Sequence, residues 1–132
     1  EIEETRCMAI TKNRMGYAEY KLGNQSEAEQ YARESLKLSN RIGDKTSITA
    51  SLICISAIFC DTGKQSAALT ILGAAESALK SSGTVLEKID QLLKEETLIK
   101  LQEKIKEQEY LKYYEEGKRM KLDEAFQLVI SN

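Results

Sequence analysis

Two stretches of the sequence decide the fold: residues 15–40, MGYAEYKLGNQSEAEQYARESLKLSN, and residues 55–80, ISAIFCDTGKQSAALTILGAAESALK. Gly23 and Gly63 are 40 residues apart, and so are Ala28 and Ala68. The same offset pairs Met15 with Ile55, Gly16 with Ser56, Leu22 with Thr62 and Ser35 with Ala75. An internal period of this length is typical of stacked supersecondary units, each too small to bury its own apolar face. The sequence therefore predicts two copies of one structural unit.

Each copy has the pattern of two antiparallel helices joined by a glycine turn. In the first copy, the apolar residues that indicate the first helix recur at roughly helical spacing: Met8, Ile10, Met15, Ala18 and Leu22. Gly23 ends that helix, and Ile42-Gly43-Asp44 ends the next one. We predict one hairpin over about 2–42 and a second over about 45–81. The first helix of the second hairpin is apolar on nearly every face, which predicts burial on several sides.

The last third of the chain has a different composition and is predicted to form a helical cap over about 84–131. Residues 85–109 are charge-dense and helical in pattern, with a break expected within 93–97. A short aromatic helix follows and is expected to end at Gly117, before a final amphipathic helix. The predicted fold class is all-α, with hairpins closed by this C-terminal cap.

Composition and charge exclude several classes of protein. The 132 residues suffice for one domain, and the absence of proline favours long helices. A net charge of −2 without a basic stripe argues against direct nucleic-acid binding, and no apolar run is long enough to cross a membrane. Three cysteines without a secretory signal indicate reduced thiols and a cytoplasmic location. Because the chain starts at Glu1 inside a helical pattern, we expect it to be a fragment of a larger protein.

No residue pattern indicates catalysis, a cofactor or a metal. Histidine is absent, which excludes histidine-based triads and Cys/His zinc sites. Cys54 and Cys60 are six positions apart on one predicted helix, about 9 Å of rise, which is too far for a disulfide. Adjacent acidic pairs such as Glu95/Glu96 point in different directions on a helix. Gly73 lies within a helix and is predicted to permit a close helix contact. The chain is thus predicted to be non-catalytic.

The repeated residues resemble the tetratricopeptide repeat. That pattern has an apolar and a small residue, a glycine turn, a small residue at the helix crossing and another further on. It reads here as Met15-Gly16, Gly23-Asn24, Ala28 and Ser35, and as Ile55-Ser56, Gly63, Ala68 and Ala75. The resemblance implies tetratricopeptide-like antiparallel hairpins arranged as an α-solenoid. Large side chains at Ala28 or Ala68 would then overpack the crossing.

The 40-residue period and the C-terminal segments are similar to the helical regions of bacterial LuxR-type and SARP-type transcriptional regulators and related predicted signalling ATPases. Two C-terminal segments show this similarity: residues 67–76, AALTILGAAE, and residues 110–130, YLKYYEEGKRMKLDEAFQLVI. Two positions depart from the family pattern: Glu19 stands where an aromatic residue is preferred, and Lys121 replaces a Ser/Thr cap. The resemblance implies a protein-interaction or signal-sensing module in the C-terminal part of such a regulator.

In such repeats the first helix of each hairpin lines an inner concave surface. Here that surface would consist of Asn13, Tyr17, Tyr20, Lys21, Ile53, Ala57 and Cys60. It is a possible groove for a protein or peptide partner, including other domains of the same parent chain. Two alternatives remain open: the C-terminal helices or a neighbouring repeat fill the groove. The rival functions are a free-standing peptide-binding scaffold and a structural module that forms a homodimer through its first helix.

Overall fold

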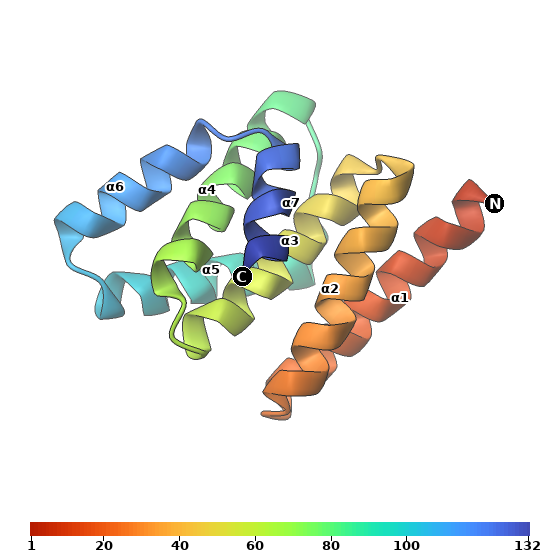
Figure 1. Cartoon of the computed structure of the whole chain (residues 1–132), viewed down its shortest axis with the longest axis horizontal. Coiled ribbons are helices and arrows are strands. Elements are labelled where there is room, and N and C mark those ends of the chain that lie inside the picture. The colour runs from red at the N-terminus through yellow and green to blue at the C-terminus, as the bar shows by residue number, and fades with distance from the viewer.

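The computed structural model describes all 132 residues, and the fold is all-α. Seven helices follow one another without any strand, and Figure 1 shows their arrangement. Their bounds are α1 Ile2–Lys21, α2 Gln25–Ile42, α3 Lys45–Asp61, α4 Gln65–Ser82, α5 Lys88–Lys104, α6 Glu107–Lys118 and α7 Leu122–Ser131. None of them combines the length and the apolar character that a membrane-spanning helix requires. The prediction of an all-α chain with helical hairpins is confirmed.

The first four helices form two hairpins with the same kind of turn. Gly23 joins α1 to α2 with φ +84°, and Gly63 joins α3 to α4 with φ +86°. Glycine suits these positions because a left-handed backbone brings a Cβ too close to a carbonyl oxygen, and glycine has no Cβ. The small residues predicted at the crossings, Ala28 and Ala68, are both fully buried. The 40-residue offset in sequence therefore corresponds to equivalent turns and equivalent buried positions.

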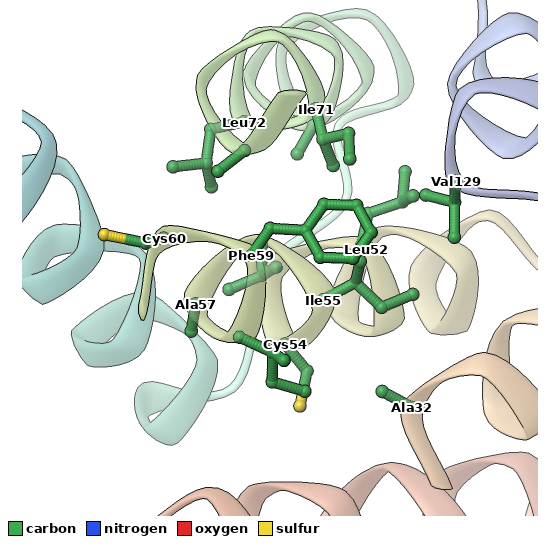
Figure 2. Packing of buried hydrophobic residues seen from close by; sticks show 14 of the residues in the cluster. Ala32, Leu52, Cys54, Ile55, Ala57, Phe59, Cys60, Ile71, Leu72 and Val129 are labelled. Carbon is green, nitrogen blue, oxygen red and sulfur yellow. The ribbon is translucent and has the colours of Figure 1, made fainter. Parts of the chain in front are cut away.

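Helix α3 lies at the centre of the molecule, and every residue from Ser47 to Cys60 is buried. Its neighbours are α1 and α2 on one side, α4 on another and α5 on a third. Phe59, the largest fully buried side chain, lies among Leu52, Ile71 and Val129 from α3, α4 and α7 (Figure 2). Burial of such side chains stabilises the fold by roughly 1.5–3 kcal/mol each. The prediction that this helix is surrounded by neighbours is thus confirmed.

Two glycines allow α4 and α6 to cross at backbone contact. Gly73 of α4 and Gly117 of α6 face each other, and a Cβ built on Gly73 would lie 2.9 Å from the backbone nitrogen of Lys118. Atoms cannot pack that closely, so neither position accepts a side chain without a shift of the helices. The predicted role of Gly73 is confirmed. The prediction that Gly117 ends its helix is wrong, because α6 continues to Lys118 and the glycine serves the crossing.

The C-terminal helices depart from the predicted boundaries in one other place. Helix α5 is continuous through 93–97, and the break falls at Ile105 and Lys106, where the backbone is extended. Within α5, the buried Thr97 hydroxyl is satisfied because it donates to the carbonyl of Leu93 at 2.7 Å. Lys121 is the N-cap of α7 as expected from its position, and the carboxylate of Glu124 accepts its backbone N–H at 2.9 Å. This is one half of a capping box, and the half that a Ser/Thr side chain would supply is absent.

Candidate interaction surface

The seven residues of the predicted concave surface fall into two groups. Ile53, Ala57 and Cys60 on α3 are fully buried, and Asn13 and Tyr20 on α1 are nearly so. Tyr17 is half-buried and Lys21 is exposed. Only the last two are therefore accessible in this chain, and the α3 part of the predicted groove is closed.

Helix α5 closes the groove by packing along α3. Ala57 and Cys60 point to the side of α3 where α5 runs (Figure 2). The Lys104 ammonium donates to the backbone carbonyl of Cys60 at 3.2 Å and lies 3.8 Å from the carboxylate of Asp61. Of the alternatives that the sequence left open, the structure has the one in which the C-terminal helices fill the inner surface.

A polar contact holds α5 to α1 at one end of this interface. The Arg14 guanidinium donates to both oxygens of Asp90, at 2.8 and 2.9 Å, and lies 3.6 Å from Glu87. Asp90 is buried, and hydrogen bonding to it raises the pKa of Arg14. Next to it, the side-chain oxygen of Asn13 is buried without a partner. Because the guanidinium binds both carboxylate oxygens, this contact favours one position of α5 relative to α1.

A second polar contact joins α1, α3 and α5 further along. The Tyr20 hydroxyl donates to Asp61 at 2.9 Å and accepts from the Lys100 ammonium at 3.1 Å. Burial raises the pKa of Tyr20 to about 12, so the phenol stays protonated near neutral pH. The hydrogen bond to this phenol raises the pKa of Lys100. With Lys21 paired to Glu96 at 3.0 Å, two of the polar residues of the predicted groove, Tyr20 and Lys21, are engaged inside the chain.

The two buried cysteines, Cys54 and Cys60, are held as thiols of low reactivity. All three are free, and burial raises the pKa of the Cys54 thiol to about 12 and also raises that of Cys60. A thiol held protonated in apolar surroundings is a poor nucleophile. No group of three or more Cys, Asp or Glu side chains is placed to hold a metal ion. Cys7 is the one exposed thiol, and it lies on α1.

The outer face of α1 carries an exposed apolar surface that the sequence did not single out. Half of the large apolar side chains that the chain exposes lie on α1 or at its C-cap. Met8, Met15 and Leu22 recur every seven residues and are 51%, 41% and 73% exposed. We define the α1 stripe as these three residues together with Cys7, Thr11 and Ala18, which are also exposed. At 100° per residue these six side chains project within one side of the helix.

The buried face of α1 is a different one, formed by Ala9, Asn13, Gly16 and Tyr20. It is built from small and polar residues because α2 passes close by: a Cβ on Gly16 would lie 3.2 Å from the carbonyl oxygen of Ala28. The apolar residues that indicated this helix in the sequence thus point mostly away from the core. One feature of the sequence could have indicated this exposed face. Met8, Met15 and Leu22 recur every seven residues, which is typical of an apolar stripe along one side of a helix.

The repeat relates the α1 stripe to buried positions of α3. Forty residues on, its counterparts are Ser47, Ile48, Ser51, Ile55 and Ile58, which are all buried, and Thr62, which is exposed. In α3 this face packs against the preceding hairpin: the hydroxyls of Ser51 and Ser35 are 2.8 Å apart, and Ile55 points toward Ala32 (Figure 2). In α1 the same face is exposed, and α1 forms an edge of the molecule (Figure 1).

Comparison of the chain with protein-family models, with curated proteins and with solved structures finds no match.

Proposed function

We propose that this chain is a non-catalytic protein–protein interaction module that binds a helical partner through the α1 stripe. The observation that carries the proposal is the contrast in burial at related positions: Met15 is 41% exposed, whereas Ile55, its counterpart 40 residues on, is fully buried. When a partner covers an apolar helix face of this kind, apolar surface is removed from water, and this burial favours binding. Methionine at two of the six positions suits a surface that adapts to its partner.

The packing of α2 on α3 indicates the chemistry of the partner. Helix α2 presents small residues there, Ala32 and Ser35, which allow the helix axes to approach. Its Arg33 guanidinium lies over the Phe59 ring at 5.7 Å and covers the end of the contact. The proposed partner is therefore an amphipathic helix with small residues at the crossing, such as the second helix of another hairpin of the same type.

The proposal also includes the type of repeat that the hairpins form. We regard the two hairpins as tetratricopeptide-like units of an α-solenoid, with α5, α6 and α7 as its C-terminal cap. The resemblance to LuxR-type and SARP-type regulators and signalling ATPases supports a parent protein of that class, in which the partner helix is part of the same chain. A free-standing peptide-binding scaffold is less well supported, because it needs the inner groove that α5 fills.

Self-association is the second candidate, and the spacing of the α1 stripe favours it. Apolar residues every seven positions, as at Met8, Met15 and Leu22, are typical of helices that pair with one another. Sedimentation of the isolated chain distinguishes this function. A monomer at all concentrations removes it, and dimerisation abolished by Met15→Lys supports it over the heterologous partner.

The main test adds the missing neighbour. A copy of residues 1–44 is fused directly before Thr5, so that the natural turn at Gly43 connects the added hairpin to α1. Cys7 of the added copy is changed to serine, which leaves the original Cys7 as the only exposed thiol. We expect the added hairpin to cover the α1 stripe, to slow the reaction of this thiol with a disulfide reagent and to raise the free energy of unfolding.

The control is Met15→Lys in the original helix. In the unfused chain this change should alter the free energy of unfolding by less than about 0.5 kcal/mol, because the side chain is exposed. In the fused chain it should restore the reactivity of Cys7. An added hairpin that unfolds separately, with Cys7 as reactive as before, would refute the proposal.

A further inference from the structure

A cavity of about 520 Å³ lies away from α1, where the end of α4 meets the turn between α6 and α7. Figure 1 shows these segments converging near the start of α3. The volume falls within the range of small-molecule sites, roughly 300–1,000 Å³. Three groups of residues line it: Ala74, Ser77, Ala78, Ser81 and Ser82 of α4, Lys118 to Asp123 of the turn, and Lys45 of α3.

The lining of this cavity is strongly positive in a chain whose net charge is −2. Lys45, Lys118, Arg119 and Lys121 face one carboxylate, that of Asp123. Only Lys118 has an acidic partner, Glu115 at 3.3 Å, while the other three cations form no ion pair. Four cations from two separate segments thus line one space, and three of them have no acidic partner in the protein.

Two of these cations lie at helix ends that already carry positive potential. Lys45 is the first residue of α3, and Lys121 is the N-cap of α7. Cations at these ends are repelled by the helix dipole, and an anion in the cavity would relieve both repulsions. Hydrogen-bond donors are also available: the backbone N–H groups of Leu122 and Asp123 donate to no carbonyl of the turn.

The α4 side adds hydroxyl groups of two kinds. Ser81 and Ser82 donate to the carbonyl of Ala78, at 3.4 and 2.6 Å. The half-buried Ser77 makes no such bond, so its hydroxyl is free to donate into the cavity. Donors thus approach the same space from α3, from α4 and from the start of α7. The tetrahedral oxygens of a phosphate match donors from several directions, whereas a carboxylate offers two oxygens in one plane.

We propose that this cavity binds the phosphate groups of a small molecule that carries at least two negative charges. The ligand links the start of α3, the end of α4 and the turn between α6 and α7. The site does not involve the α1 stripe, and it stands independently of the proposed interaction function.

The test is an NMR titration of the full chain with pyrophosphate at low ionic strength, where exposed charges are least screened. Saturable shifts are expected for the amides of Ser77, Ser81 and residues 118–123. Replacing Arg119 and Lys121 together by alanine should weaken binding by about tenfold or more. Both side chains are exposed and unpaired, so the double variant should keep the fold, as circular dichroism will verify.

Lys106→Ala is the matched control. This exposed lysine lies at the opposite end of α6 from Lys118, about 18 Å away for 12 residues of helix. Its loss should leave the affinity unchanged. Equal binding by the double variant, or shifts spread over all exposed lysines, would overturn the site.

Two further ligands test the chemistry. ADP should bind at least as tightly as pyrophosphate, since it carries the same diphosphate group on a small molecule. Citrate has comparable charge on carboxylates and should bind more weakly. Citrate binding as tight as that of pyrophosphate, or ADP excluded from the cavity, would overturn the assignment to a phosphorylated small molecule.

Discussion

Helices α1 and α3 occupy equivalent positions in the two hairpins, yet one forms an edge of the molecule and the other its centre. Ile55 is fully buried and Met15 is 41% exposed, although they are the same position of the repeat. The two helices differ in their neighbours: α3 is flanked by the first hairpin and by α4 and α5. Helix α1 packs mainly on α2 and α3, and it meets α5 through polar side chains such as Arg14 and Tyr20. Burial at a repeated position therefore depends on what stacks beside it, and an unmatched face marks a place for a partner.

The largest expected effect compares alanine at these two positions. Ile55→Ala should lower the free energy of unfolding by about 2–5 kcal/mol, because it leaves a cavity in the core. Met15→Ala should change it by less than about 0.5 kcal/mol, since the side chain already contacts water. Urea denaturation of both variants measures the difference. Similar losses at the two positions would mean that α1 is covered in solution, for example by a second copy of the chain.

An intermediate effect is expected where α1 meets α5. Arg14 corresponds to Cys54 in the repeat, and its side chain pairs with the buried Asp90. Arg14→Ala should cost about 1–3 kcal/mol, because the carboxylate then stays buried without its partner. Lys21→Ala breaks the exposed pair with Glu96 and should cost less than about 1 kcal/mol. If the two variants lose equal stability, the contact at Asp90 is not what holds α5 in place.

The smallest expected effect concerns alkaline pH. Burial raises the pKa of Cys54 from 9.0 to about 12, and that of Tyr20 and Tyr114 from 10.0 to about 12. Between these values the unfolded chain has lost protons that the folded chain keeps, so the stability is complete below the lower value and falls as pH rises. The free energy of unfolding should drop by roughly 1–2 kcal/mol between about pH 8 and about pH 10, mostly through Cys54.

Cysteine variants identify the source of this loss. Cys54→Ala should reduce the alkaline loss of stability, because the thiol that α3 buries is then absent. Cys7→Ser on the exposed face of α1 should leave the loss unchanged. Denaturant unfolding at several pH values, under reducing conditions, measures both. A loss that persists in full in Cys54→Ala would place its origin elsewhere in the chain.

Much of the fold could be predicted because its signals are local. Gly23 and Gly63 adopt the left-handed turns expected of them, and the position of Gly73 in a helix correctly indicated a close crossing. Gly117 was misassigned as a helix end because the same residue serves turns and crossings, and only its distance from Gly73 separates the two roles. The burial of the predicted concave residues could not be predicted from their spacing. It depends on α5, which begins more than 25 residues after the end of α3.

The sequence by itself determined the helices, their turns and the 40-residue register, because these depend on backbone preference and on apolar spacing along a continuous segment. Only the tertiary structure decided which of the repeated faces is covered. The choice depends on where α5 packs, on the pairing of Arg14 with Asp90 and on the absence of a neighbour beside Met15. Burial is a property of surfaces brought together from distant segments, and no residue pattern within one helix specifies it.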